Sequence, residues 1–162
     1  YSEPGEGTTF KIYLPRHTTE RVNVSVASQP VIAPSGTETV LLVEDEEVLL
    51  KLSARMLDQM GYTVLAAGSP NQALQMAKGY ADPIHLLLTD VIMPEMSGRD
   101  LWQRLSALRP DMKCLFMSGY TANLIAHHGV LDKDVHFLQK PFSREELAQK
   151  LRKALSASEV AR

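Results

Sequence analysis

The sequence is poor in cysteine. Its only cysteine, Cys114, lies within the apolar run 113–117, where a buried thiol is expected. A single cysteine cannot support a framework of intrachain disulfides, and such a composition is typical of proteins in a reducing compartment. We therefore expect a cytoplasmic location.

Long apolar runs and an excess of one charge are also missing. No stretch approaches the roughly 20 apolar residues that cross a bilayer, and the first residues have no signal-peptide pattern. The net charge is -2, and no run of basic residues occurs. We therefore expect neither contact with a membrane nor a nucleic-acid partner.

The remaining composition, 44% hydrophobic and 22% charged residues, is that of an ordinary globular protein. A chain of 162 residues suffices for one domain with an appendage. The appendage is expected at the start, because Phe10, Ile12 and Leu14 alternate on one face as in an edge strand. The predicted organisation is an N-terminal segment at 1–15, a linker at 16–38, a domain at 39–157 and a tail at 158–162.

Strand and helix patterns alternate five times from residue 39 onward. The predicted strands are short and apolar, at 39–43, 62–66, 86–90, 114–117 and 135–138. Helices are predicted at 46–60, 69–79, 98–108 and 121–128, and from a capping box of Ser143 and Glu146 onward. The first helix carries on one face Val48, Leu49, Leu52, Met56 and Leu57. Five such units predict an α/β fold, a doubly wound five-stranded parallel sheet with helices on both faces.

Polar side chains stand at the ends of four predicted strands. Glu44 and Asp45 follow the first strand, Asp90 ends the third, and Ser118 and Lys140 follow the fourth and fifth. The carboxyl ends of parallel strands meet at one edge of a sheet, where such sheets bind ligands. If the first and third strands are neighbours, three carboxylates share a pocket, and a hard cation such as Mg²⁺ would relieve their repulsion.

This set of groups can transfer a phosphoryl group to a carboxylate. Asp90 would be the nucleophile, and it needs no general base because an ionised carboxylate is already nucleophilic. Mg²⁺, Lys140 and the hydroxyl of Ser118 would surround the phosphoryl oxygens. Taken singly, the same residues have plainer interpretations, as acids favoured by a helix dipole, a helix cap and a solvated lysine. Their occurrence together at four strand ends favours phosphoryl transfer.

The segment from Asp90 to Gly98 reads Asp-x-x-Met-Pro-x-Met-x-Gly and resembles response-regulator receiver domains. The resemblance extends over residues 39–157 and includes the polar residues at the strand ends. It implies two-component phosphorelay signalling and a flavodoxin-like sheet of order 2-1-3-4-5. It also implies a switch on the face formed by the fourth helix, the fifth strand and the fifth helix.

The resemblance implies a metal site and a phosphoacceptor. Asp90 would accept the phosphoryl group. Asp45 and Asp90 would ligate Mg²⁺ directly, Glu44 would do so through water, and the backbone carbonyl of Ile92 would complete the site. The expected cofactor is therefore Mg²⁺ bound through oxygen atoms.

The resemblance further implies contacts to the phosphoryl group and a switch residue. Ser118 and Lys140 would contact the phosphoryl oxygens, and the peptide bond before Pro141 is expected to be cis. Phe137 takes the place of the family's rotating aromatic residue. Because phenylalanine lacks a hydroxyl, packing alone would carry the switch signal.

Residues 5–15 resemble the closing strand of a histidine-kinase ATP-binding domain, just after its glycine-rich lid. This implies the C-terminal part of a hybrid sensor kinase. The kinase's phosphorylated histidine and ATP-binding asparagine are not in this sequence, so it should not phosphorylate itself from ATP. The implied partners are a histidine-kinase dimerisation and phosphotransfer domain and a separate histidine phosphotransfer protein. Without its former sheet, this N-terminal strand is expected to be mobile or paired with another molecule.

Three alternatives compete with this interpretation. A degenerate receiver would only bind partners, although the acids, hydroxyl and lysine are all in place. A phosphatase with an aspartyl nucleophile needs a second acid two residues later, where Ile92 stands. A nucleotide-binding Rossmann domain is excluded because no glycine fingerprint follows the first strand.

Overall fold

A computed structural model describes residues 2–3, 5, 7–8, 11–13, 36–119 and 136–156. The chain divides into two units, Tyr1–Val31 and Ile32–Arg162, which we describe separately. The predicted tail, most of the predicted linker and the predicted helix at 121–128 lie outside the described residues. In the described part of the chain, no helix combines the length and apolar character needed to cross a membrane.

The first unit contains a short antiparallel pair, β1 (Ser2–Glu3) and β2 (Gly7–Thr8). The predicted edge strand is wrong where it is described, because residues 11–13 form no strand. Ile12 and Tyr13 are 82% and 86% exposed. An alternating pattern forms a strand when a neighbouring strand pairs its backbone and covers its apolar face. Phe10 and Leu14 lie outside the described residues.

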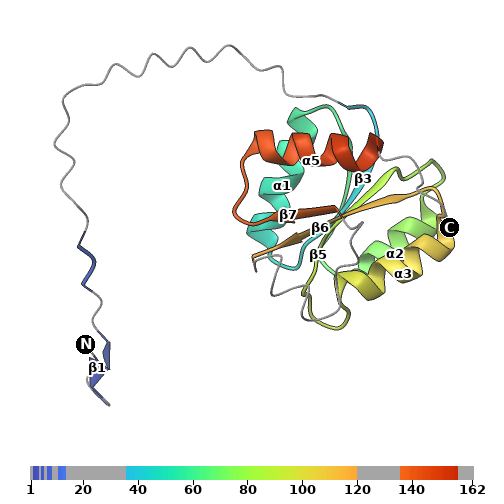
Figure 1. The fold of residues 1–162 in the computed structure, drawn as a ribbon. Helices are drawn as coiled ribbons and strands as arrows, with labels where there is room; N and C mark the ends of the chain where they lie inside the picture. Colours follow the sequence, from blue (N-terminus) through green and yellow to red (C-terminus); the bar gives the residue numbers. More distant parts are fainter. Residues whose placement is uncertain are drawn as a thin grey trace, which may run out of the picture. The chain divides into compact units, whose positions relative to one another are not determined.

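The second unit contains a five-stranded sheet in which every pairing is parallel. Its order is β4-β3-β5-β6-β7, which confirms the predicted order 2-1-3-4-5 (Figure 1). The strands are β3 (Thr39–Val43), β4 (Thr63–Ala67), β5 (Leu86–Asp90), β6 (Lys113–Ser118) and β7 (His136–Gln139).

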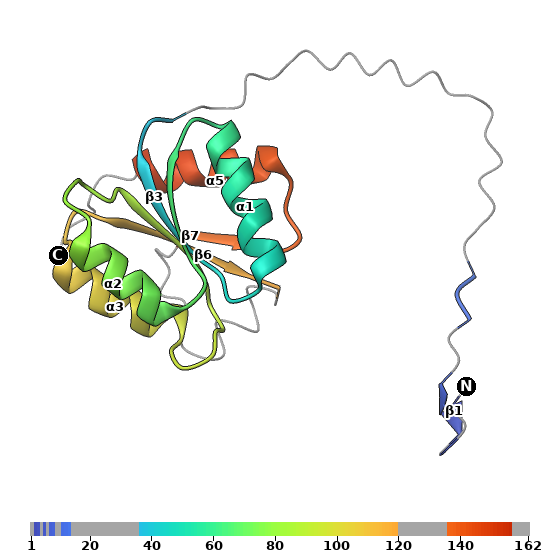
Figure 2. The same cartoon turned by 180° about the vertical axis from the view of Figure 1, so that it is seen from behind.

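Helices cover both faces of this sheet. As Figures 1 and 2 show, α1 (Glu47–Gln59) and α5 (Arg144–Ser156) lie on one face, and α2 (Pro70–Gly79) and α3 (Gly98–Leu108) on the other. Leu86 and Leu88 of β5 join the core beneath α1 and α5, whereas Leu87 joins the core beneath α2 and α3. All three are 0% exposed, which explains the uninterrupted apolar run.

The apolar face predicted for α1 is only partly buried. Val48 is 70% exposed and Leu52 is 50% exposed, whereas Ser53 and Leu57 are buried. Apolar residues spaced three and four apart cover a wide sector of a helix, and only part of that sector faces this sheet. The remaining apolar side chains of α1 are therefore available at the surface.

Side-chain caps fix the starts of three helices. The Ser69 hydroxyl accepts a hydrogen bond of 3.2 Å from the Gln72 N–H, and Ser97 caps α3 in the same way. The predicted capping box is confirmed: Ser143 Oγ accepts from the Glu146 N–H, and Glu146 accepts from the Ser143 N–H.

Candidate functional site

Three carboxylates meet at the carboxyl edge of the sheet. Glu44 and Asp45 follow β3, and Asp90 ends β5, the strand next to β3. One oxygen from each carboxylate lies within 4.8 Å of the other two. The sheet order thus brings together the acids that the sequence places 45 residues apart at Asp45 and Asp90.

The three acids differ in their exposure. Glu44 is 1% exposed, Asp90 is partly buried and Asp45 is exposed. Desolvation raises the pKa of Glu44 above its ordinary value and outweighs the opposing hydrogen bond from Lys140. A cation in the same pocket would therefore stabilise the ionised form of Glu44.

Lys140 supplies such a cation from the end of β7. Its Nζ lies 2.5 Å from Glu44 Oε2 and 2.6 Å from Asp90 Oδ2. Burial by itself lowers the pKa of Lys140, but its hydrogen bonds and charge interactions with Asp90 and Glu44 outweigh burial, so the net pKa lies above its ordinary value. Lys140 is therefore charged and joins the ends of three strands.

The backbone around Lys140 holds this side chain in place. The Lys140 N–H donates a hydrogen bond of 2.8 Å to the carbonyl of Ser118, at the end of β6. The peptide bond between Lys140 and Pro141 is cis, as expected. Ser118 is 1% exposed and Phe137 is half-buried beside Val91 and Phe116. Ser118 therefore lies on β6, the strand next to that of Asp90, and Phe137 lies on β7, one strand further.

The loop after Asp90 returns to the carboxylate. The Ile92 N–H donates a hydrogen bond of 3.1 Å to Asp90 Oδ1, while the Ile92 side chain is 60% exposed. Gly98 donates its N–H to the Val91 carbonyl. A Cβ at Gly98 would collide with the Asp90 carbonyl oxygen, so only glycine fits where α3 begins.

The sequence did not point to Glu95 or Asn71. Glu95 has a φ of 69°, a left-handed conformation that is unfavourable in free energy for a residue with a Cβ. Its Oε2 accepts a hydrogen bond of 2.7 Å from Asn71 Nδ2 at the start of α2. The one signal in the sequence was that Glu95 lies between Pro94 and Gly98, two residue types that are typical of turns.

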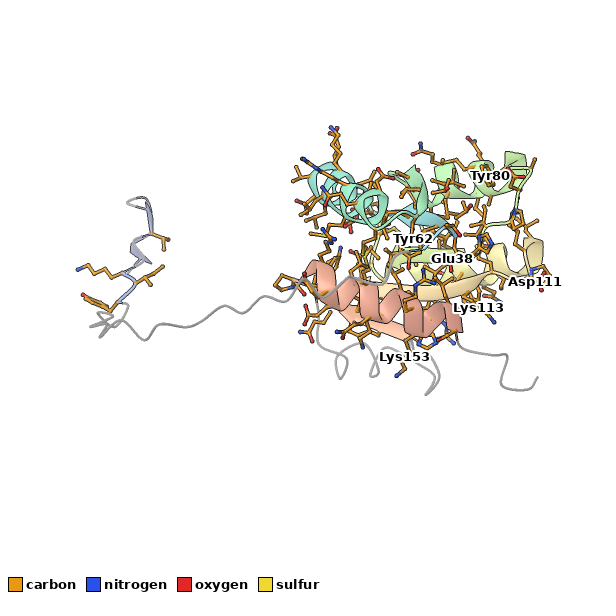
Figure 3. The ribbon with its side chains drawn as sticks, turned by 90° about the horizontal axis from the view of Figure 1, so that it is seen from above. Glu38, Tyr62, Tyr80, Asp111, Lys113 and Lys153 are labelled. Carbon is orange, nitrogen blue, oxygen red and sulfur yellow. The ribbon has the colours of Figure 1, made fainter. Side chains whose placement is uncertain are left out.

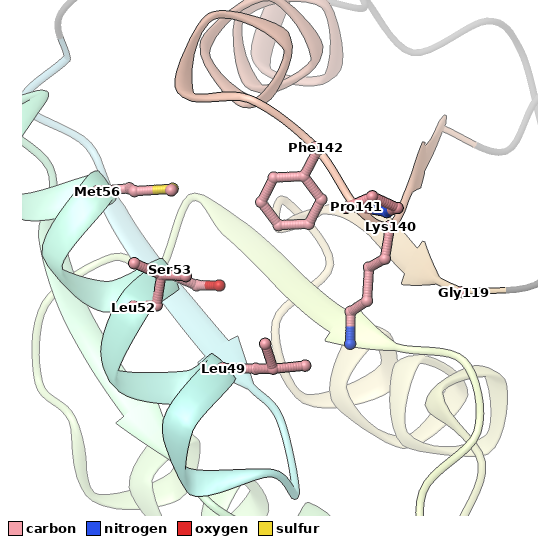
Figure 4. Close-up of a pocket in the computed structure, with 8 residues that line it drawn as sticks. All are labelled: Leu49, Leu52, Ser53, Met56, Gly119, Lys140, Pro141 and Phe142. Carbon is pink, nitrogen blue, oxygen red and sulfur yellow. The ribbon is translucent and has the colours of Figure 1, made fainter. Parts of the chain in front are cut away.

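A mostly apolar groove of about 390 Å³ adjoins Lys140 (Figure 4). One wall comes from α1, and the other comes from the segment between β7 and α5. Figure 4 shows Phe142 facing α1 across the groove. The lining residues are Leu49, Leu52, Ser53, Met56, Gly119, Lys140, Pro141 and Phe142. Helical periodicity placed Leu49 and Leu52 on one face of the first helix but did not predict a groove there.

The donor atoms of this centre suit a hard divalent cation. Glu44, Asp45 and Asp90 offer oxygen atoms alone, and oxygen ligands with room for water are what Mg²⁺ prefers. The buried, raised-pKa carboxyl of Glu44 fits the same purpose, because a cation would stabilise its ionised form. The residues present therefore fit Mg²⁺.

Comparison with known proteins places this arrangement in a family. Residues 40–152 match the family model of the response regulator receiver domain. Sensor kinase CckA of Brucella abortus (strain 2308) is 38% identical over 164 residues, which cover 95% of this chain and 17% of the kinase. The response regulator receiver protein CpdR of the same strain is 31% identical over 119 residues, covering 74% of this chain and 98% of its own.

A solved structure gives the same result. The crystal structure of the receiver domain of the hybrid histidine kinase CckA matches with a TM-score of 0.62 at 33% identity, covering 73% of this chain and 99% of that domain. The present chain spans only about a sixth of the CckA kinase, 17% of its length. Family model, relatives and fold agree that this chain belongs to the response regulator receiver domains of two-component systems.

Proposed function

We propose that this chain accepts a phosphoryl group on Asp90 from a phosphohistidine and so takes part in a phosphorelay. A carboxylate oxygen of Asp90 attacks phosphorus, the phosphorus–nitrogen bond breaks, and its electron pair returns to the imidazole of the donor. One observation carries the proposal: Lys140 Nζ lies 2.6 Å from Asp90 Oδ2. That contact puts a cation beside the atoms on which the negative phosphoryl oxygens would gather.

The other residues of the site orient Asp90 and the incoming group. The Ile92 N–H holds Oδ1 while Lys140 holds Oδ2, so the plane of the carboxylate is fixed before reaction. Ser118 would offer its hydroxyl to a phosphoryl oxygen from the end of β6. Phe137, half-buried on β7, would respond to that contact by a change of packing.

Glu44, Asp45 and Asp90 would hold Mg²⁺ together with the backbone carbonyl of Ile92. When bound, the ion would neutralise negative charge on the phosphoryl oxygens. Glu44 stays in the pocket because it is buried, and Asp45 provides the exposed ligand nearest solvent. Together with Lys140, these groups balance the charge that a dianionic phosphoryl group brings to Asp90.

The phosphodonor is a histidine-containing domain. Receiver domains in hybrid kinases exchange phosphoryl groups with such partners, either the dimerisation and phosphotransfer domain of a kinase or a separate histidine phosphotransfer protein. The groove beside Lys140, with the half-exposed Leu52 on its α1 side, offers apolar surface to the helix that carries the histidine.

We also propose that the chain is the C-terminal part of a hybrid sensor kinase and works in the cytoplasm. The alignment with the CckA kinase covers 95% of the chain and thus extends beyond residues 40–152 of the receiver match. Residues 1–15 would then be the end of a kinase ATP-binding domain. They lack that domain's ATP-binding asparagine, so phosphoryl groups would reach Asp90 from elsewhere.

Incubation with acetyl phosphate and Mg²⁺, followed by intact mass measurement, tests the chemistry. The wild type should gain one phosphoryl group, whereas Asp90→Asn, or the wild type with a chelator, should gain none. Asp111→Asn is the matched control, because Asp111 is an exposed carboxylate at the opposite edge of the sheet. A wild type that gains nothing, even from a phosphorylated histidine kinase, would favour the alternative of a receiver that only binds partners.

A further inference from the structure

The segment just before β3 is bound tightly to α5. Arg152 of α5 donates two hydrogen bonds to the Glu38 carboxylate, of 2.7 Å to Oε1 and 3.3 Å to Oε2. The Arg152 guanidinium also lies over the Tyr62 ring, 5.5 Å from its centroid. Figure 3 shows Glu38 and Tyr62 close together, near α5. We call Gly36, Glu38, Tyr62 and Arg152 the junction.

Backbone hydrogen bonds and close packing around Gly36 hold the junction together. The Gly36 N–H donates a hydrogen bond of 3.0 Å to the Met60 carbonyl, and the Thr63 N–H donates one of 3.1 Å to the Glu38 carbonyl. Gly36 is buried, and a Cβ there would collide with Arg152, Glu38 and Tyr62. The chain therefore enters the domain through a closely packed passage whose wall includes a side chain of α5.

The opposite end of α5 begins beside the phosphoacceptor site. Lys140 contacts Asp90, and Pro141, Phe142 and Ser143 connect it to α5. Four side chains of α5 are 0% exposed in one core cluster, which favours movement of the helix as one body over bending: Leu147, Ala148, Leu151 and Ala154. From Arg144 to Arg152 it spans about 12 Å at 1.5 Å per residue. One rigid element thus has Lys140 before one end and Arg152 near the other.

The junction contains an unsatisfied group. The Tyr62 hydroxyl is buried and has no hydrogen-bond partner among the described residues. A buried polar atom without a partner raises the free energy of the arrangement that contains it. A small movement of Arg152 and Glu38 that admits water would relieve this cost. Within the described part of the chain, the Tyr62 hydroxyl therefore contributes no hydrogen bond that would hold the junction closed.

We propose that the junction is a latch through which α5 couples the state of Asp90 to the chain that precedes Gly36. This inference rests on the proposed function. A phosphoryl group on Asp90 adds negative charge beside Lys140, which must leave its present contacts with Glu44 and Asp90 to meet the new oxygens. The segment 140–142 moves with it, α5 follows, and the hold of Arg152 on Glu38 loosens.

Linkage makes the proposal testable, because coupling is reciprocal. If modification of Asp90 loosens the latch, then opening the latch must favour the modified state. The probe is beryllofluoride with Mg²⁺, a phosphoryl mimic, titrated against the whole chain and followed by Trp102 fluorescence. Glu38→Gln should bind beryllofluoride at least about fivefold more tightly than the wild type. Arg152→Gln should give the same shift, and the double variant should add nothing to it.

Asp111→Asn is again the matched control. Asp111 is an exposed carboxylate just before β6, so it lies at the edge of the sheet where the junction lies, but it does not contact Arg152. The affinity of this variant for beryllofluoride should equal that of the wild type. A second measurement needs no variant. Hydrogen exchange at the Gly36 and Thr63 amides should become faster when beryllofluoride binds the wild type, because both amides donate within the junction.

The outcomes separate the two proposals. Binding of beryllofluoride with unchanged junction exchange, or with unchanged or weaker affinity in Glu38→Gln, would overturn the latch and leave Asp90 as the phosphoacceptor. No binding of beryllofluoride and no labelling by acetyl phosphate would overturn both. Tighter binding in both latch variants together with faster exchange supports the coupling.

Discussion

Asn71 at the start of α2 donates a hydrogen bond of 2.7 Å to Glu95 in the loop that follows Asp90. Glu95 has a φ of 69°, so the backbone there is held in a conformation that a residue with a Cβ rarely adopts. The same loop carries the Ile92 N–H that binds Asp90 Oδ1. A side chain on α2 thus helps to fix the shape of the loop that follows Asp90.

Asn71→Ala should loosen that loop and weaken Mg²⁺ binding by about twofold to fivefold, in keeping with the ~0.5–1 kcal/mol net worth of one hydrogen bond. Glu95→Ala should have an equal effect, and the double variant should be no worse than either single variant. A Mg²⁺ titration followed by Trp102 fluorescence measures this. Fully additive losses would show that the two residues act independently.

Gly98→Ala should destabilise the domain by about 1–3 kcal/mol, because the added Cβ would press on the backbone of Asp90 at the start of a packed helix. Gly79→Ala is the matched control. Its Cβ would meet nothing within 4 Å at the end of α2, so it should be neutral or stabilising by up to about 1 kcal/mol. Urea denaturation of both variants gives the comparison. Equal stability of the two would contradict the packing argument.

Lys140→Met should separate metal binding from phosphoryl transfer. Without the ammonium group, the three carboxylates lose their own cation, so Mg²⁺ affinity should rise by about tenfold, or about 1.4 kcal/mol. Labelling by acetyl phosphate should fall, because Asp90 loses the group that neutralises the incoming phosphoryl oxygens. Weaker Mg²⁺ binding in this variant would mean that Lys140 holds the carboxylates in position for the ion and does not compete with Mg²⁺ for them.

The pair of Glu38 and Arg152 should make stability depend on pH. Burial alone would raise the pKa of Glu38, but the hydrogen bond and charge of Arg152 outweigh burial and place it below its ordinary value. The stabilisation is therefore complete above the unfolded pKa, about 4.3, and is lost as the pH falls through the lower folded value.

At pH 7, Glu38→Gln should be less stable than the wild type by about 0.5–1 kcal/mol, a small amount because both side chains are partly exposed. The difference should shrink as the pH is lowered below about 4.3. Thermal unfolding across this range measures it. A difference that persists unchanged at low pH would assign the effect of the substitution to packing instead of charge.

The sequence alone determined most of the fold. Short apolar runs with no alternation, such as Leu86–Leu88, required a strand buried on both faces. Ser69, Gly98 and Ser143 marked where helices begin. The acids, the hydroxyl and the lysine at strand ends could then be assigned to one edge, because a parallel sheet aligns its carboxyl ends. Local hydrogen bonding and periodicity suffice for such inferences.

Sequence patterns failed where the partner was distant or missing. The alternating residues 11–13 look like a strand, yet the structure places them outside any strand. Val48 and Leu52 fit a helical core face, yet both are exposed. Periodicity indicates which face of a helix or strand the apolar side chains share. Their burial depends on whether another element packs against that face.

The sequence could place Lys140 and the acids at one edge of the sheet, but only the tertiary structure decided which polar side chains are in direct contact. Lys140 joins Glu44 and Asp90, Asn71 reaches Glu95, and Arg152 holds Glu38 across the domain. Each of these contacts spans many residues and depends on the side-chain conformations that packing permits. A sequence pattern sets backbone hydrogen bonds within a few residues, but the energy of a charge depends on how much water its final surroundings exclude, and that is known only once the chain has folded.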